Sequence, residues 1–283
     1  MLRRVAKLFN EPAFKEAPLT VIGRAISWSA SVALGRSPVF HLVDGGAKLR
    51  VPANMRYTSV STFLLRDASE PELHYLQKFV GKGDIFVDVG ANIGLFTLKA
   101  APHAARVVAV EPGEAAGTQL DANVALNGFS NVAVVRKALS DKPGTAELHH
   151  NPLGDDPQAF SLISDGTDSG SEQVEVTTLD TLVQGLNLPR VDCIKIDVEG
   201  AEGMVIAGGM ETISAYHPTV IFEINCPTLH KAGGDPASAW NALAGLGYEF
   251  YRMQENGTLL ALPVRPTDFS NIVARHRDSA VLH

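Results

Sequence analysis

The residues best suited to chemistry lie in a short glycine-containing stretch, residues 84–94. Residues 85–89 form an apolar run interrupted only by Asp88, which predicts a buried parallel strand. Gly90 and Gly94 then predict a tight turn, and the following Leu-Phe-Thr-Leu-Lys-Ala predicts the start of a helix. A strand, a glycine turn and a helix N-terminus bring backbone N–H groups and a positive dipole end to one point. This arrangement is typical of α/β proteins that bind a nucleotide-like cofactor.

Acidic side chains follow two further predicted strands. Glu111 comes directly after the strand at residues 106–110. It follows Gly90 by about 20 residues, the spacing expected of an acid that binds ribose hydroxyls. Asp197 and Glu199 follow the strand at residues 193–196. Ligands of open α/β sheets bind at the carboxyl ends of the strands, so we expect these acids to lie near the cofactor.

The turn lacks the features of phosphate-binding loops. In Gly-x-Gly-x-x-Gly the middle glycine lets the backbone approach a pyrophosphate, and Asn92 takes that position here. The chain also has no Gly-x-x-x-x-Gly-Lys-Ser/Thr motif. Asp88 would repel a phosphate, but it could order the turn or bind a cationic amino group, directly or through water. S-adenosylmethionine has an amino-acid end, a ribose for Glu111 and no phosphate, so it is the predicted cofactor.

Strands and helices alternate around this turn. Strands are predicted at residues 85–89, 106–110, 132–135, 193–196 and 219–225, with helices at 114–126 and 201–209. This order predicts a doubly wound α/β fold. An antiparallel hairpin of residues 248–251 and 258–262 around Asn256-Gly257 is expected to complete the sheet. A helix over residues 71–79, capped by Ser69, should precede the first strand.

Residues 151–171 are rich in Gly, Asp, Pro and Ser. They predict a long lid or binding loop, with disorder as the alternative.

The first 36 residues differ in charge from the rest of the chain. They contain six basic and two acidic residues, a net charge of +4. Residues 20–34 are apolar at helical spacing and include Trp28, and residues 39–52 predict a β-hairpin. We interpret the helix as an accessory element that packs on the main domain, and peripheral contact with an anionic membrane surface is the alternative. Residues 1–69 are thus predicted to form an accessory segment and residues 70–283 the main domain.

Composition narrows the function class. With 283 residues, 45% apolar and 19% charged, the chain can build one large globular domain with an accessory segment. Its net charge of −7 disfavours a nucleic-acid partner. Cys193 and Cys226 lie in strand-like surroundings and are interpreted as core thiols of a reducing compartment. No stretch approaches the roughly 20 apolar residues of a membrane-spanning helix, and we predict a cytoplasmic protein.

Together these motifs resemble the FkbM family of S-adenosylmethionine-dependent methyltransferases, a branch of the class I, Rossmann-like methyltransferases. The resemblance covers residues 70–274 and rests on six stretches in the family's order: Phe86-Val-Asp-Val-Gly-Ala-Asn-Ile-Gly94, Val110-Glu-Pro112, Leu179-Asp180, Ile194-Lys-Ile-Asp-Val-Glu-Gly-Ala-Glu202, Phe222-Glu-Ile224 and Phe269-Ser-Asn-Ile272. It implies a mixed sheet of seven strands with the last strand antiparallel. It also implies O-methylation of a hydroxyl on a sugar, polyketide or other secondary metabolite.

The cofactor site is expected to draw on three parts of the chain. The methionine end should be held by the first strand and its turn, through Asp88, Gly90, Ala91, Asn92 and Gly94. Glu111, followed by Pro112, should accept hydrogen bonds from the ribose. The family's layout implies that Ala138 and Leu139 frame the adenine by backbone and apolar contact.

Catalysis is expected to depend on Asp197. Methyl transfer is an in-line displacement, so the enzyme mostly aligns the reacting atoms, and a base takes the hydroxyl proton. Asp197 is the first candidate for that base or for positioning the acceptor, and it also contacts the cofactor site. Glu199 is the second candidate. The alternative for Glu199 or Glu202 is that its carboxylate only caps the following helix.

Two other routes to an activated hydroxyl are weighed. His149 and His150 border the 151–171 loop and could reach the acceptor, although an exposed histidine pair is usually only solvated. A divalent metal held by Asp197, Glu199 and Glu223 could also activate it. Because these acids follow two separate strands that need not converge, we predict no metal.

The sequence therefore predicts an O-methyltransferase for a hydroxyl of a saccharide or secondary metabolite. An RNA ribose methyltransferase is the alternative enzyme, and a binding module that kept the cofactor fold without an acceptor site is the non-enzyme alternative. No Asn/Asp-Pro-Pro-aromatic motif follows the strand at residues 193–196, which disfavours N-methylation of bases. The acceptor is expected to be selected by the 151–171 loop and the N-terminal segment.

Overall fold

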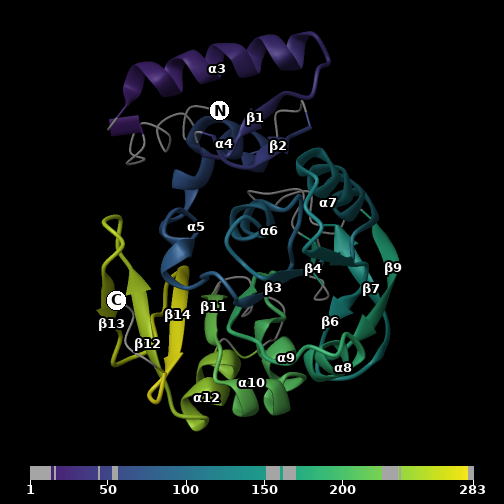
Figure 1. The fold of residues 1–283 in the computed structure, drawn as a ribbon, viewed down its shortest axis with the longest axis vertical. Helices are drawn as coiled ribbons and strands as arrows, with labels where there is room; N and C mark the ends of the chain where they lie inside the picture. Colours follow the sequence, from purple (N-terminus) through teal and green to yellow (C-terminus); the bar gives the residue numbers. More distant parts are fainter. Residues whose placement is uncertain are drawn as a thin grey trace.

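The computed structural model describes residues 14, 15, 17–43, 45–52, 57–150, 160–161, 170–224, 235 and 237–279. Its centre is an eight-stranded sheet in the order β13-β12-β14-β11-β10-β3-β4-β5 (Figure 1). The strands are β3 (Ile85–Val89), β4 (Arg106–Val110), β5 (Val132–Val135), β10 (Cys193–Ile196), β11 (Thr219–Ile224), β12 (Tyr248–Met253), β13 (Leu259–Ala261) and β14 (Ser270–His276).

The strand directions confirm the predicted fold class. Strands β5, β4, β3, β10 and β11 are mutually parallel, and β14 lies antiparallel between β11 and β12. Two strands run opposite to that set: β14, the last strand of the chain, as predicted, and β13, the second strand of the 248–262 hairpin. That hairpin is present as β12 and β13. Because β13 adds a strand at the edge, the sheet has eight strands instead of seven.

Helices cover both faces of this sheet (Figure 1). One face carries α5 (Pro71–His74), α6 (Leu95–Ala100) and α7 (Glu114–Asn127). The other carries α8 (Leu179–Gly185), α9 (Glu202–Ala207), α10 (Met210–Tyr216) and α12 (Ser238–Gly245). Alternate strand residues pack into two separate hydrophobic clusters, so Phe86 and Cys193 face α5 and α6 while Val87 and Ile194 face the opposite layer.

The helix predicted over residues 71–79 is broken. The chain forms a 3₁₀ turn η1 (Arg66–Ser69), the short α5, and a second 3₁₀ turn η2 (Leu76–Lys78). Tyr75 between α5 and η2 has φ −100° and ψ 23°, outside the α-helical range. Ser69 is not the cap, because Glu70 takes the N-cap position and no side chain caps α5. Thr178 caps α8, since its side chain accepts the Thr181 N–H at 3.0 Å.

A second sheet follows β5. It contains β6 (Ala138–Leu139), β7 (Gly144–His150), β8 (Phe160–Ser161) and β9 (Ser171–Thr177) in the order β6-β9-β7-β8. Of the predicted 151–171 loop, only 160–161, 170 and 171 are among the described residues, and the first two pair with β7 as β8. Cys193 is buried, as predicted, and Cys226 lies outside the described residues.

The N-terminal segment contains the predicted helix and hairpin. These are α3 (Pro18–Ala33), β1 (Val39–His41), β2 (Lys48–Arg50) and a further helix α4 (Tyr57–Leu65). Trp28 of α3 and Phe40 of β1 both pack on Phe63 of α4, with ring centroids 5.1 and 5.0 Å apart. The same hydrophobic cluster includes Ile93 of the glycine turn and Leu98 of α6, so the N-terminal segment packs on the turn and on the helix that follows it. No helix in the described part of the chain is both long and apolar enough to cross a bilayer.

Two asparagines of α7 bind the hairpin strand β2, and one of them also binds the glycine turn. Asn123 is fully buried and accepts the Arg50 N–H at 2.9 Å. Its Nδ2 donates to the carbonyls of Arg50 (3.2 Å) and Ile93 (2.9 Å). Asn127 similarly accepts the Lys48 N–H at 2.6 Å and donates to the Lys48 carbonyl at 2.7 Å. The side-chain amides thus replace a neighbouring strand along the edge of β2.

We expect Asn123→Ala to lower the free energy of unfolding by about 1–3 kcal/mol, because the buried Ile93 carbonyl and the part-buried backbone groups of Arg50 lose their partner. Urea unfolding measures the loss. Asp121→Ala, on the same helix with an exposed side chain, is the matched control and should stay near zero. Equal effects of the two variants would contradict a structural role for Asn123.

Candidate functional site

The site begins where β3 and β10 end side by side. The Asp197 N–H donates to the Val89 carbonyl at 2.9 Å, which continues the parallel ladder beyond β10. Gly90 has φ +78°, and a Cβ on it would lie 1.8 Å from the Asp197 carbonyl oxygen. Only glycine fits this position, because both the backbone conformation and the space exclude a side chain. The predicted cofactor turn and the predicted catalytic acid are therefore direct neighbours.

The glycine turn is held mostly by its own protein partners. At least four of its five N–H groups donate within the chain: Gly90 and Ala91 to the Val110 carbonyl (2.9 and 3.0 Å), Asn92 to Glu111 Oε2 (2.8 Å) and Gly94 to the Ala91 carbonyl (2.8 Å). A phosphate binds such a turn through free N–H donors. The turn is therefore poorly suited to phosphate.

Glu111 is the main partner of this turn. Its carboxylate is buried and accepts N–H groups from Asn92 (2.8 Å) and Gly113 (2.8 Å), one on each oxygen. Burial raises the pKa of Glu111 to about 7, against the lowering effect of these two hydrogen bonds. A carboxylate has about four acceptor sites, so Glu111 retains capacity for hydroxyl donors.

Asp88 lies beneath the turn. Its Oδ2 accepts the Thr97 hydroxyl at 2.6 Å, and its side chain is almost fully buried. Burial raises the pKa of Asp88 to about 6, while the hydrogen bonds from the Thr97 hydroxyl and backbone oppose the shift. Asp88 therefore fixes the first turn of α6 relative to β3, which is one of the two roles expected from the sequence.

The remaining predicted cofactor residues flank Glu111. Pro112 directly follows it and is partly exposed. Ala138 and Leu139 form β6 and are both buried. The side chain of Leu139 packs in the main core and that of Ala138 in the core of the second sheet. A ligand beside β6 would therefore meet mainly backbone atoms.

Asp197 is paired with a lysine that the sequence interpretation missed. Lys195 Nζ lies 3.1 Å from Asp197 Oδ2, and the two side chains are 1% and 36% exposed. The ammonium also lies 5.1 Å from the centroid of the Phe96 ring. Burial disfavours the charge of Lys195, but Asp197, Glu70 and Glu223 outweigh it and raise its pKa. The available signal was a lysine inside the buried strand Cys193-Ile-Lys-Ile196.

Three more carboxyl groups surround Lys195 on the α5 side of the sheet. Asn271 Nδ2 donates to Glu70 (3.2 Å) and Glu72 (3.4 Å) at the start of α5. Glu223 lies opposite Asn271 in the β11–β14 register, and its buried Oε1 has no hydrogen-bond partner among the described residues. Burial raises the pKa of Glu70 to about 7 and raises those of Glu72 and Glu223. Asp197 is thus the partly exposed end of a charged cluster.

The family assignment agrees with this geometry. A family model described as the methyltransferase FkbM domain matches residues 88–250, more than half of the chain. The chain belongs to the FkbM methyltransferase family. The match begins at Asp88 and includes the glycine turn, Glu111, Asp197 and Glu223.

Two curated relatives of this FkbM-family protein are fungal methyltransferases. Methyltransferase sdnD of Sordaria araneosa is 27% identical over 224 residues, which cover 68% of this chain and 81% of that protein. Methyltransferase 1 of Beauveria bassiana is 30% identical over 141 residues, covering 43% and 57%. A solved FkbM methyltransferase from Methylobacillus flagellatus matches 78% of this chain and 54% of its own, with a TM-score of 0.46 and 15% identity. Because that score is low, the assignment rests on the family model.

In this FkbM-family methyltransferase the other predicted acids have distinct places. Glu202 is buried, and its Oε1 accepts the N–H groups of Val198 (3.2 Å) and Gly200 (3.1 Å). It thus orders the loop that carries Asp197 and Glu199 through N–H groups that precede α9, and differs from the helix cap that the alternative predicted. Glu199 is partly exposed and has φ +53°, a left-handed conformation that is costly for this residue type.

The histidine and metal alternatives gain no support. His149 lies on β7 of the second sheet, and the side chain of His150 is outside the described residues. Among the described residues, no group of three or more His, Cys, Asp or Glu side chains has a geometry that could hold a metal ion.

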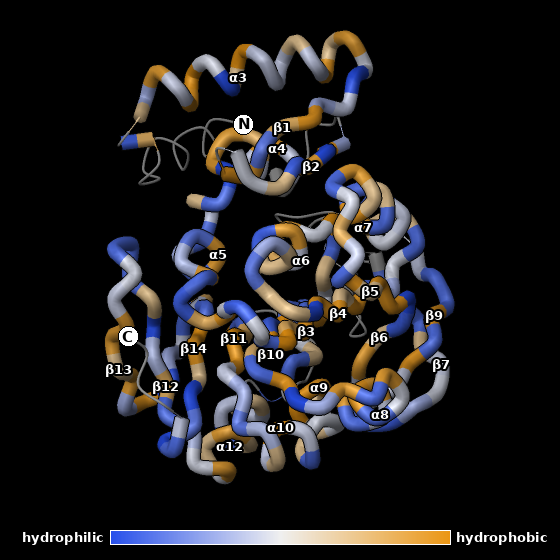
Figure 2. The backbone as a smooth tube through the Cα atoms, viewed as in Figure 1, coloured by the Kyte–Doolittle hydropathy of each residue, from blue (hydrophilic) through white to orange (hydrophobic). Residues whose placement is uncertain are grey.

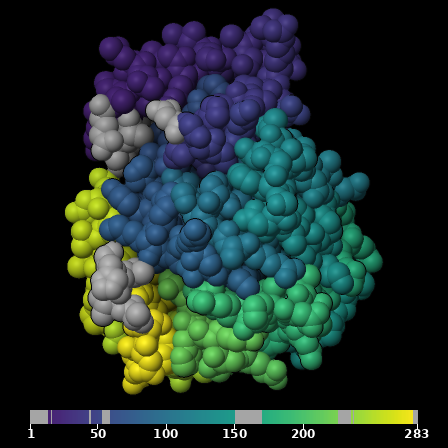
Figure 3. Space-filling model, viewed as in Figure 1, coloured from purple at the N-terminus to yellow at the C-terminus, as the bar shows by residue number. Residues whose placement is uncertain are grey.

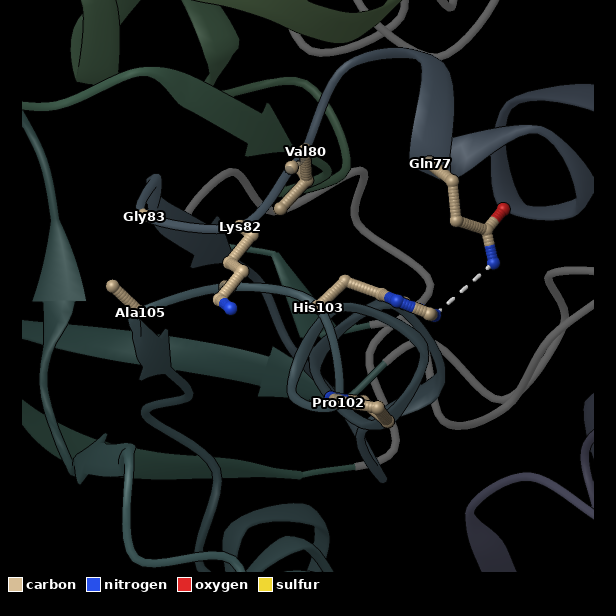
Figure 4. Close-up of a pocket in the computed structure, with 9 residues that line it drawn as sticks. Gln77, Val80, Lys82, Gly83, Pro102, His103 and Ala105 are labelled. Atoms are coloured by element: carbon tan, nitrogen blue, oxygen red, sulfur yellow. Dashed lines mark hydrogen bonds between the residues drawn. The ribbon is translucent and has the colours of Figure 1, made fainter.

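A surface hollow lies at the other end of the strands (Figure 4). It is lined by Gln77, Lys82, Pro102 and His103, next to the amino ends of β3 and β4. The figure shows Gln77 facing His103, 3.5 Å apart between their Nε2 atoms. Because the glycine turn and Asp197 lie at the carboxyl ends of these strands, the hollow is separate from the candidate site.

We expect Gly90→Ala to lower the free energy of unfolding by clearly more than the backbone cost alone. A left-handed backbone conformation costs an L-residue about 1–2 kcal/mol. The added Cβ would collide with the Asp197 carbonyl. Gly128→Ala is the matched control, since it has φ +65° with nothing within 4 Å of the added Cβ, and should show the backbone cost alone. Equal urea midpoints for the two variants would contradict the close contact.

Stability should fall as pH rises from about 4.5 to about 7. The pKa of Glu202 is raised by burial from its ordinary 4.5 to about 7, so the folded state binds more protons than the unfolded chain in this window. Deprotonation above it leaves a buried charge. Glu202→Gln, which keeps the acceptor oxygen, should flatten the decline in urea-unfolding midpoints measured across this range. A slope unchanged by the substitution would contradict the burial of an ionisable Glu202.

Proposed function

We propose that this FkbM-family methyltransferase uses S-adenosylmethionine to methylate a hydroxyl of a saccharide or secondary metabolite. The observation that carries the proposal is the contact between Gly90 and Asp197. It puts a partly exposed carboxylate beside the turn that the cofactor would occupy. Such an arrangement suits a base that acts on an acceptor held next to the methyl donor.

The residues at the turn fit S-adenosylmethionine better than a phosphorylated cofactor. The N–H groups of the turn are largely used within the protein, and the buried Asp88 lies below it. The turn residues Gly90 to Gly94 would hold the amino-acid end, Glu111 with Pro112 the ribose, and the backbone at Ala138 and Leu139 the adenine. When bound, the cofactor supplies an electrophilic methyl group on a sulfonium.

The chain's own chemistry lies in Asp197 and its neighbours. The Asp197 carboxylate would accept the hydroxyl proton of the acceptor and orient its oxygen. Lys195 lies 3.1 Å from Oδ2 and would fix the rotation of this carboxylate, so it is a positioning residue. Glu199, partly exposed in the same loop, is the second candidate for the base.

The charge around Asp197 favours a small or glycan acceptor over RNA. Glu70, Glu72 and Glu223 line the same side of the sheet with Lys195 as the nearby cation. Proteins usually bind a phosphodiester backbone with several Lys and Arg side chains, and Lys195 is already paired with Asp197. Binding of S-adenosylmethionine without turnover on any hydroxyl acceptor would instead favour the non-catalytic binding module.

A calorimetric titration with S-adenosylmethionine tests the cofactor, and a methyl-donor assay with hydroxylated acceptors tests the reaction. We expect Asp197→Asn to lower kcat by about 10²–10⁴-fold, the usual contribution of a general base, with little change in cofactor affinity. Asp121→Asn, the same change at an exposed site on α7, is the control and should keep full activity. Full activity of Asp197→Asn would remove Asp197 as the base.

A further inference from the structure

The outward side of α3 is apolar. Its exposed large side chains include Leu19 (83% exposed), Ile22 (44%) and Ile26 (68%), and Leu34 (65%) follows at its end. Residues 19, 22 and 26 recur at i, i+3 and i+7, so they share one side of the helix. Figure 2 shows hydrophobic stretches along α3, and Figure 3 shows this helix at the outer edge of the molecule.

The inward side of α3 already has its partners. Val21 and Trp28 are buried in the cluster formed with β1, β2 and α4. Arg24 Nη1 donates to the Leu64 carbonyl at 2.8 Å, which uses the one charged side chain within the helix. Packing on the protein therefore explains one side of α3, and a different partner is needed to cover the other.

Charge indicates the kind of partner. Residues 17–43 contain no Asp or Glu, and Lys15 and Arg36 flank the helix. The first 36 residues carry a net charge of +4. Since the whole chain carries −7, the remaining residues carry −11. A contact between two copies through α3 would bring two positive segments together. An anionic lipid surface offers both negative charge and an apolar layer.

We propose that α3 is an interfacial helix that binds an anionic lipid bilayer. Leu19, Ile22 and Ile26 enter the boundary between headgroups and acyl chains, and the flanking basic residues contact the headgroups. The 16-residue helix packs along the protein through its inner side, so it would lie parallel to the bilayer surface. This inference does not depend on the methyl acceptor.

Co-sedimentation of the full chain with vesicles tests the proposal. We expect binding to phosphatidylcholine vesicles that contain phosphatidylglycerol, weak binding to phosphatidylcholine alone, and release as ionic strength rises. The double variant Leu19→Asp/Ile26→Asp should lower the partition coefficient for the mixed vesicles by at least about tenfold, because it puts two charges into the apolar side of the helix.

The matched control is Leu260→Asp/Val264→Asp, which makes the same change at apolar side chains that are 52% and 75% exposed on and beside β13. It should bind vesicles like the unaltered chain, and circular dichroism should show both double variants folded. No binding to mixed vesicles, or equal loss in both variants, would overturn the proposal. A different result would also overturn it: light scattering shows a dimer, the α3 double variant is a monomer, and the unaltered chain does not bind vesicles.

Discussion

The candidate site depends on one close approach, that of β10 to the end of β3. The Asp197 carbonyl fills the space of any Cβ on residue 90, so the glycine turn and the Asp197 loop form one unit. Glu111 and the Val110 carbonyl hold the glycine turn by accepting its N–H groups. Asp88 fixes α6 below it through Thr97. Three stretches of the chain, residues 88–97, residues 110–111 and the loop at Asp197, are therefore held in one arrangement by contacts within the protein, which lowers the cost of ordering a reactive geometry.

The charged cluster around Lys195 is the second constraint. Burying an ammonium among hydrophobic strands is costly unless carboxylates surround it, and here Asp197, Glu70 and Glu223 raise its pKa and keep it charged. Hydrophobic residues of similar volume would give at least as stable a core, so stability alone does not account for the cluster. The proposed role of Lys195, to position the Asp197 carboxylate beside the glycine turn, would account for it. Burial within the cluster raises the pKa values of Glu70 and Glu223.

The N-terminal segment links the site to the outer surface of the protein. Asn123 contacts both the hairpin strand β2 and the Ile93 carbonyl in the glycine turn. On the other side of the same segment, α3 packs through Trp28 and leaves Ile26 exposed. The N-terminal segment therefore contacts the glycine turn on one side and exposes the apolar side of α3 on the other.

The sequence by itself determined the residues with local signatures. The strand, turn and helix at residues 85–100, the acids Glu111 and Asp197, and the doubly wound order follow from periodicity and spacing, because these depend on neighbouring residues. The tertiary structure alone decided which side chains meet. Lys195 was not predicted as a site residue because its partners Glu70 and Glu223 come from separate elements. Only the contacts of Glu202 with Val198 and Gly200 showed that this side chain orders the Asp197 loop. The break at Tyr75 and the insertion of β14 between β11 and β12 likewise depend on packing between distant segments, which local sequence does not encode.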